Sequence, residues 1–173
     1  RAGSTSTADL NKVVLYCNAP LEGIQEDITE ADLTAGLACV TAYDAAYSHA
    51  TQDSTVKQHP VGASPYAYAV LGARYNSGVN SGKFKLAAIG DYDSVFAIRT
   101  SKSTAHLNRD TYWYYLPAYS MGFAPMATVS LNSADTSQAG TSNHRMSWHI
   151  NSGGYRAGST STADLNKVVL YCN

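Results

Sequence analysis

The chain carries the same eighteen residues twice. Arg1 to Asn18 spells RAGSTSTADLNKVVLYCN, and residues 156–173 repeat it without one substitution. Chance does not produce such a match, and an old duplication would have accumulated differences between its copies. The interval from Arg1 to Arg156 is 155 residues, about one domain in length. We therefore expect residues 1–155 to form one repeat unit, and residues 156–173 to be a linking strand or the start of the next unit.

An apolar strand is predicted inside the repeat. From Lys12 to Cys17, apolar side chains occupy both sets of alternating positions. A strand that is apolar on both faces belongs in the interior of a sheet or between layers. Left unpaired, it would expose a ladder edge and two apolar faces to water. The residues expected to link one unit to the next are Val13, Val14, Leu15, Tyr16, Cys17, Cys39, Val168, Val169, Leu170, Tyr171 and Cys172.

The three cysteines are balanced only when the repeat is considered. Cys172 is the second copy of Cys17, so one period holds two cysteines and can form one disulfide. Cys39 can pair with Cys17 or with Cys172. The first bond would close a short local loop, and the second would tie the body of the unit to the repeated strand. Two buried free thiols are the remaining alternative.

Short strands separated by Gly, Asn and Ser turns predict the fold class. We expect an all-β chain with minor α content, built as an antiparallel β-sandwich or a jelly-roll-like single domain with a repeated terminal strand. Helical spacing of apolar residues predicts one helix over 22–37, with Thr29 positioned to cap it. The expected strands are 12–17, 38–48, 66–75, 83–89, 94–100, 111–116, 127–131, 145–150 and 155–156, with hairpin turns at 90–93 and 151–154.

Charge and motifs exclude several function classes. The formal net charge is −1 and 14% of residues are charged, so no nucleic-acid partner is expected. No apolar run is long enough to span a bilayer. Catalytic motifs and phosphate loops are missing from the sequence, so we expect no enzyme and no cofactor. Two groups could offer cation ligands, but neither has a full ligand spacing, and no metal is expected: Asp91 with Asp93, and Asp44, His49, Asp53 and His59.

Two aromatic clusters suggest glycan binding as an alternative. Strand-like residues Tyr112, Trp113 and Tyr114 could stack on sugars, although alternate rings of a strand must point inward. Trp148, His149, Asn151 and Arg156 lie across a predicted tight turn and could bind a sugar or a carboxylate. The simpler interpretation is a hairpin whose polar side chains serve the fold.

These patterns favour a structural role. We expect an extracellular or cell-surface, secreted protein whose identical units join head to tail into a filament or surface fibre, by β-strand donation or as covalent tandem repeats. Its partners would be copies of itself. A carbohydrate-binding, lectin-like module with glycan partners is the alternative function. An engineered permutant, or a monomer with a spare tail, would also explain the repeat.

Overall fold

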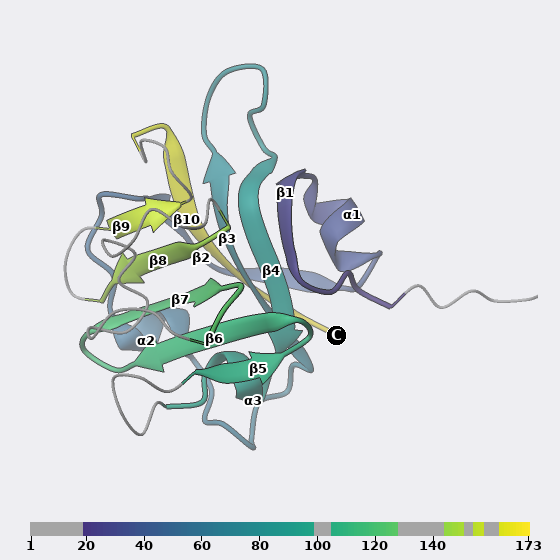
Figure 1. The fold of residues 1–173 in the computed structure, drawn as a ribbon, viewed down its shortest axis with the longest axis vertical. Coiled ribbons are helices and arrows are strands. Elements are labelled where there is room, and N and C mark those ends of the chain that lie inside the picture. The colour runs from purple at the N-terminus through teal and green to yellow at the C-terminus, as the bar shows by residue number, and fades with distance from the viewer. Residues whose placement is uncertain (1–18, 99–104, 128–143, 151–153, 158–162) are drawn as a thin grey trace, which may run out of the picture.

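Two antiparallel sheets of five strands each form the protein (Figure 1). The computed structural model describes residues 19–98, 105–127, 144–150, 154–157 and 163–173. In chain order the elements are β1 (Ile24–Ile28), α1 (Glu30–Thr34), β2 (Cys39–Ala46), α2 (Asp53–Val56), β3 (Tyr68–Tyr75), β4 (Phe84–Asp91), α3 (Tyr92–Val95), β5 (His106–Asn108), β6 (Thr111–Leu116), β7 (Ser120–Ala124), β8 (Met146–His149), β9 (Gly154–Ala157) and β10 (Leu165–Cys172). The all-β prediction with minor helix is confirmed.

The first sheet has the strand order β1-β4-β3-β10-β2. Its second strand from the edge, β10, follows all the others in sequence, yet it lies between β3 and β2 and pairs antiparallel with both. The β10–β2 ladder spans Asn166↔Ala46 to Cys172↔Cys39, with a register shift between Val169 and Leu170. The last part of the chain is therefore an interior component of this sheet.

The second sheet has the strand order β5-β6-β7-β8-β9. Each strand pairs antiparallel with the strand next to it in sequence. The predicted pairing of the segments at 145–150 and 155–156 is confirmed by β8 and β9, whose ladder includes Ser147↔Arg156. Strands β5 and β7 were not predicted. The strand predicted at 127–131 lies almost wholly outside the described residues, because 128–143 are not described.

One apolar core joins the two sheets. Side chains from β3, β4 and β10 meet those from β6, β7 and β8, among them the fully buried Leu71, Val169, Trp113 and Phe123. A Cβ atom on Gly90 would stand 2.8 Å from the Trp113 ring, so glycine allows this indole of the second sheet to approach the first sheet closely. The two sheets thus pack as the layers of a sandwich.

A smaller core lies on the other face of the first sheet. There α1 places Leu33 against Phe84, Val168 and Leu170. The predicted cap is present, because the Thr29 hydroxyl accepts from the Asp32 backbone N–H at 3.2 Å. The helix predicted over 22–37 is wrong in its first half, which forms β1 and pairs with β4.

The hairpin predicted around residues 90–93 is also wrong. The chain continues as β4 to Asp91 and then turns into the single helical turn α3. Tyr92, Val95 and Phe96 are buried in the core between the sheets, so this helical turn contributes side chains to that core. Residues 84–91 remain a strand, as predicted for 83–89.

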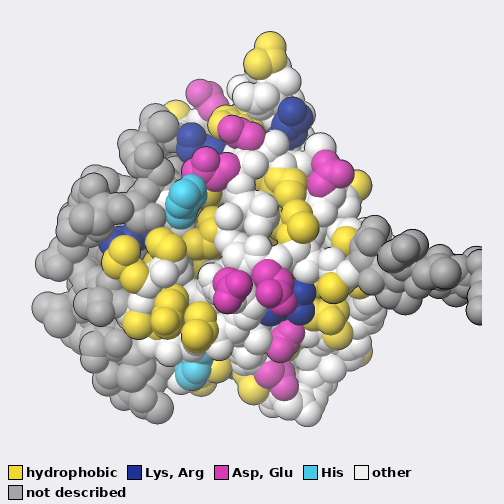
Figure 2. Space-filling view, turned by 45° about the vertical axis from the view of Figure 1, so that its right-hand side comes forward, with side chains coloured by type: hydrophobic (Ala, Val, Ile, Leu, Met, Phe, Trp, Pro, Cys, Tyr) yellow, Lys and Arg dark blue, Asp and Glu magenta, His cyan; other side chains and the backbone are white. Residues whose placement is uncertain are grey.

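Charged groups are mixed on the visible surface. On the face shown in Figure 2, acidic side chains lie beside basic ones, and apolar side chains form small groups separated by uncharged polar side chains and backbone. Within the described parts of the chain, no helix is long and apolar enough to cross a membrane.

Candidate functional site: the strand slot

The repeated segment defines the candidate site, because its second copy forms β10. We call the position between β2 and β3 the strand slot. Main-chain pairing holds β10 there on both sides, and the ladder to β3 runs without a break from Leu165↔Tyr75 to Cys172↔Tyr68. Seven of its eight side chains are buried: Leu165, Lys167, Val168, Val169, Leu170, Tyr171 and Cys172.

Both ends of the slot are closed by further hydrogen bonds. Asn173 and Ala38 exchange backbone bonds at 3.0 Å each, and the Asn173 side chain accepts from the Ala67 N–H at 2.9 Å. At the other end, the Asn76 N–H donates to the Asp164 carbonyl at 3.0 Å. Hydrogen bonds therefore hold ten consecutive residues, from 164 to 173, in this position.

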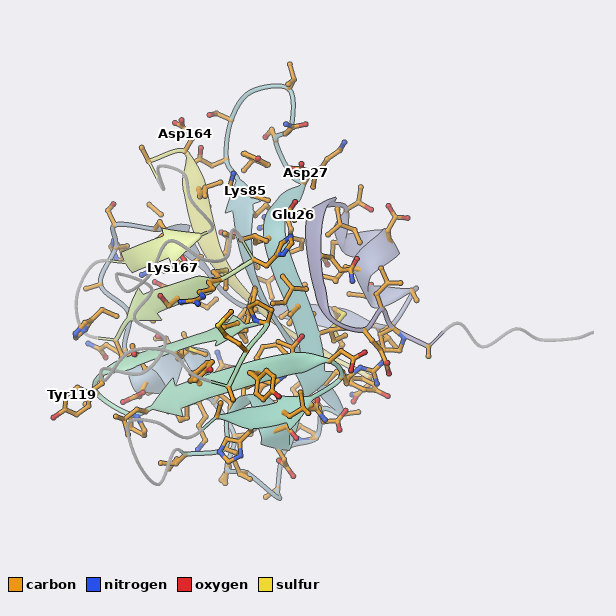
Figure 3. All side chains as sticks on the ribbon, viewed as in Figure 1. Glu26, Asp27, Lys85, Tyr119, Asp164 and Lys167 are labelled. Carbon is orange, nitrogen blue, oxygen red and sulfur yellow. A yellow bond between two sulfur atoms is a disulfide. The ribbon has the colours of Figure 1, made fainter. Side chains whose placement is uncertain are left out.

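The inner face of β10 carries a buried lysine. Lys167 is 0% exposed, and its Nζ donates to the His49 carbonyl at 2.5 Å and to the Thr51 hydroxyl at 2.7 Å. Figure 3 shows Lys167 among the strands, whereas Tyr119 and Asp164 lie at the rim. Burial lowers the pKa of Lys167 to about 8. An ammonium inside a core is costly unless it is hydrogen-bonded, so these two acceptors are what make this position suitable for lysine.

Tyr171 forms the second polar contact on the inner face. Its hydroxyl donates to the Val56 carbonyl at 2.8 Å and accepts from the Gln58 N–H at 3.0 Å. The ring packs against Tyr66 and Tyr92, with centroid distances of 5.2 and 5.3 Å. Burial raises the pKa of the Tyr171 phenol, which therefore remains a donor at neutral pH.

The outer face of β10 carries the apolar and covalent contacts. Val168, Leu170 and Cys172 belong to the smaller core with Leu33 of α1. A disulfide joins Cys172 to Cys39, its direct partner in the β10–β2 ladder. Of the two pairings that the sequence allowed, the structure contains the one between Cys39 and the second copy of the repeat.

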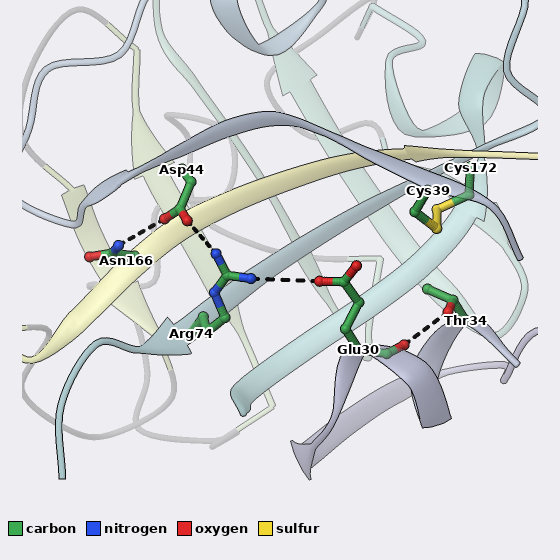
Figure 4. Close-up of polar contacts among 7 residues, drawn as sticks. All are labelled: Glu30, Thr34, Cys39, Asp44, Arg74, Asn166 and Cys172. Carbon is green, nitrogen blue, oxygen red and sulfur yellow. Dashed lines mark hydrogen bonds and ion pairs between the residues drawn. A yellow bond between two sulfur atoms is a disulfide. The ribbon is translucent and has the colours of Figure 1, made fainter. Parts of the chain in front are cut away.

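A polar network crosses the outer surface of the slot (Figure 4). The Asn166 amide donates to Asp44 of β2 at 2.8 Å, and Asp44 also pairs with Arg74 of β3. Arg74 in turn lies 3.6 Å from the Glu30 carboxylate of α1. The network ties the three neighbouring strands and the helix together at the half-exposed position of the repeat.

The predicted linkage residues are thus partly located. Cys39 and the five residues 168–172 meet in the slot, and Val13, Val14, Leu15, Tyr16 and Cys17 lie outside the described residues. Sequence reasoning missed Asn166 and Lys167, which bind Asp44 and the His49 carbonyl. The signal was the alternation itself, since residues 165, 167, 169 and 171 share one face and Lys167 stands among apolar side chains.

The first aromatic cluster is in the wrong place for sugar stacking. Trp113 and Tyr114 are 0% and 1% exposed, so their rings are packed inside the protein, and Tyr112 is half-buried. This corrects the proposed platform: Trp113 fills the core against Phe123, and the Tyr114 hydroxyl donates to the Met126 carbonyl. Alternation places Trp113 on the face toward the core between the sheets, whereas Tyr114 lies on the opposite face, where it is buried in a separate small cluster with Ala124.

The two aromatic clusters also lie apart. In the ladder, Trp148 of β8 pairs with Met121 of β7, and Met121 pairs with Tyr115 of β6. Trp148 is therefore two strands away from β6, at the position of Tyr115, which is three residues from Tyr112. That offset is about 10 Å in each direction. His149 is half-buried with Nδ1 2.7 Å from the Ile150 carbonyl, Arg156 lies on β9, and Asn151 is outside the described residues. In the ladder of the second sheet, Trp148 and Tyr112 are therefore not neighbours.

The aspartates of these groups have structural partners. Asp53 accepts from the Tyr115 hydroxyl at 3.0 Å and from the Ala118 N–H at 2.7 Å. Asp91 accepts from the Asn108 amide at 2.8 Å. Among the residues that the structure describes, no three His, Cys, Asp or Glu side chains are grouped as a metal site.

No protein-family model matches the chain, and no curated protein or solved structure matches it either. The class of protein is therefore given by the fold alone: an all-β sandwich completed by a repeated strand.

Proposed function

We propose that this chain is a structural protein whose copies join head to tail through the repeated strand. The observation that carries the proposal is the position of β10. One copy of the repeat fills an interior slot of the first sheet, and the same sequence is present a second time in the chain. A slot that accepts residues 164–173 accepts residues 9–18 of another molecule with the same side chains.

The energy of such a joint suits a durable polymer. Each of the buried Val168, Val169, Leu170 and Tyr171 side chains contributes about 1.5–3 kcal/mol when removed from water. The strand also adds main-chain bonds on two sides, which is the physical basis of strand addition between subunits. A head-to-tail contact of this kind extends without closing, so it builds a filament.

Covalent tandem repetition is the second form of the same proposal. There, each slot is filled by the repeat that follows it in one polypeptide, and neighbouring units share no exchanged strand. In both forms the role is structural and not catalytic. We place the protein outside the cell, because a disulfide such as Cys39–Cys172 persists in oxidising compartments.

Removing the first copy tests the exchange. A chain beginning at Ala19 contains every described element but has one strand for one slot. We expect this chain to be a monomer, and the full chain to form species at integer multiples of its mass after refolding at high concentration. Light scattering and negative-stain images measure this difference.

The matched control removes only residues 1–7, which keeps the apolar strand. This shorter truncation should assemble like the full chain. If the full chain and the chain beginning at Ala19 are both monodisperse monomers of equal stability, exchange of strands between molecules is wrong.

A further inference from the structure

The slot faces its occupant with two pairs of polar groups, and they are far apart along the strand. Near the start of β10, the His49 carbonyl and the Thr51 hydroxyl receive the Lys167 ammonium. Near its end, the Val56 carbonyl and the Gln58 N–H receive the Tyr171 hydroxyl. Both pairs belong to the segment that follows β2, which lies beside the inner face of the slot.

The spacing of these two contacts determines the register. Lys167 and Tyr171 are four residues apart and on the same face, with Val169 between them in the core. A slip by one residue would turn the lysine toward Leu33 and Phe84 in the smaller core. A slip by two residues would keep the face but would place the ammonium at the apolar position of Val169. Either slip leaves buried polar groups without partners, which costs more than the lost bonds alone.

We infer that the strand slot selects its occupant by these two inward polar side chains, so that its specific partner is a strand with Lys and Tyr four residues apart. Resting on the proposed function, this assigns Lys12 and Tyr16 of a neighbouring copy as the recognition residues of the joint. The apolar side chains that line the slot would bind any apolar strand. The lysine and the tyrosine make the slot prefer the repeated segment over other apolar strands.

The two identical copies provide an internal competition that tests the inference. Tyr16→Phe weakens the first copy and Tyr171→Phe weakens the second, and each change keeps the ring while removing one hydroxyl. The proportion of Cys39 bonded to Cys17 or to Cys172 then reports which copy fills the slot. A protease that cuts after glutamate resolves the two products, because Glu22, Glu26 and Glu30 separate Cys17 from Cys39.

Chains of heavy and light isotope are mixed, unfolded, reduced and reoxidised together, and the linked peptides are identified by mass spectrometry. Relative to the unsubstituted chain, Tyr16→Phe should lower the ratio of Cys17 to Cys172 linkage about tenfold, and Tyr171→Phe should raise it about tenfold. The double variant should restore the original ratio. Lys12→Met and Lys167→Met should move the ratio in the same two directions.

Tyr119→Phe is the matched control, because Tyr119 is 53% exposed and lies outside the slot; it should leave the ratio unchanged. If the single variants at Tyr16 and Tyr171 give the ratio of the unsubstituted chain, selection by these side chains is wrong. The isotope label answers the separate question of exchange. If Cys17 links to Cys39 only within chains of one isotope, the proposed joining between molecules is wrong. The change in the linkage ratio still tests whether Lys and Tyr select the strand.

Discussion

The two sheets of this protein are assembled from the chain in different ways. Every neighbour in the second sheet is also the next strand in sequence. In the first sheet, Cys39 and Cys172 face each other across 133 residues of sequence, and the strand between β3 and β2 comes from the far end of the chain. Closing long loops is entropically costly and slow. The difference shows that the second sheet needs only local contacts, whereas the first is incomplete until a repeated strand enters it.

The largest expected effect is on the entering strand. In a chain beginning at Ala19, which has no competing copy, Val169→Asp should cost about 4 kcal/mol or more in the free energy of unfolding, because it places a carboxylate in the core between the sheets. Leu107→Asp in β5 is the control, since this side chain is 61% exposed and the change should stay within about 0.5 kcal/mol. Urea denaturation measures the free energy of unfolding of both variants. Similar losses of stability would mean that the first sheet does not depend on β10 more than the second sheet depends on β5.

The disulfide should stabilise the first sheet more than the second. Replacing Cys39 and Cys172 together by alanine in the same shortened chain is expected to cost about 2–4 kcal/mol. Amide hydrogen exchange should accelerate most in β2 and β10, and least in β6 and β7, because the bond ties only the former pair. Equal acceleration in all four strands would show that the two sheets open as one unit and that the disulfide does not stabilise the first sheet selectively.

The smallest expected effect is a pH dependence from the slot. Burial lowers the pKa of Lys167 to about 8, while an unfolded lysine titrates near 10.4. Between these values the unfolded chain holds more protons than the folded one, so stability should rise as the pH increases from 8 toward 10. Above about pH 10 the trend should reverse, because burial raises the pKa of Tyr171 and Tyr115 in the folded protein and unfolded tyrosine ionises first.

Substitution of the lysine checks the origin of this rise. In the chain beginning at Ala19, Lys167→Met should abolish the increase between pH 8 and 10 in thermal or urea unfolding. Lys85→Met, at a lysine outside the slot on β4, should retain it. A rise that persists in Lys167→Met would assign the pH dependence to other groups.

The sequence predicted the interior strand for a physical reason. A run with apolar side chains on both faces needs protein on both sides, and residues 168–172 have it. Alternation places Lys167 on the apolar face of the strand, but its complete burial could not be predicted, because the sequence does not show which groups would accept its hydrogen bonds. Its acceptors, the His49 carbonyl and Thr51, are more than a hundred residues away in sequence, and only the fold brings them together.

The failed helix and hairpin predictions have different causes. Ile24 and Ile28 are four residues apart, a spacing that puts both on one face of a helix and also on one face of a strand, so the pattern alone could not decide between them. At residues 90–93 a glycine and two aspartates suggested a tight turn between strands. Burial of Tyr92 and Phe96 decided for a helical turn instead, because both rings fill the core between the sheets.

The place of β10 in sequence has a consequence for synthesis on the ribosome. The strand that completes the first sheet emerges after all its neighbours, while the first copy of the same segment has emerged 155 residues earlier. At ordinary elongation rates of about 5–20 residues per second, that delay is roughly 8–30 seconds. β3 ends at Tyr75 and β10 begins 90 residues later at Leu165, so for roughly 5–18 seconds of that delay β2 and β3 present open edges. In that interval the first copy of the same chain is available to these edges, and on a polysome so are the first copies of neighbouring nascent chains.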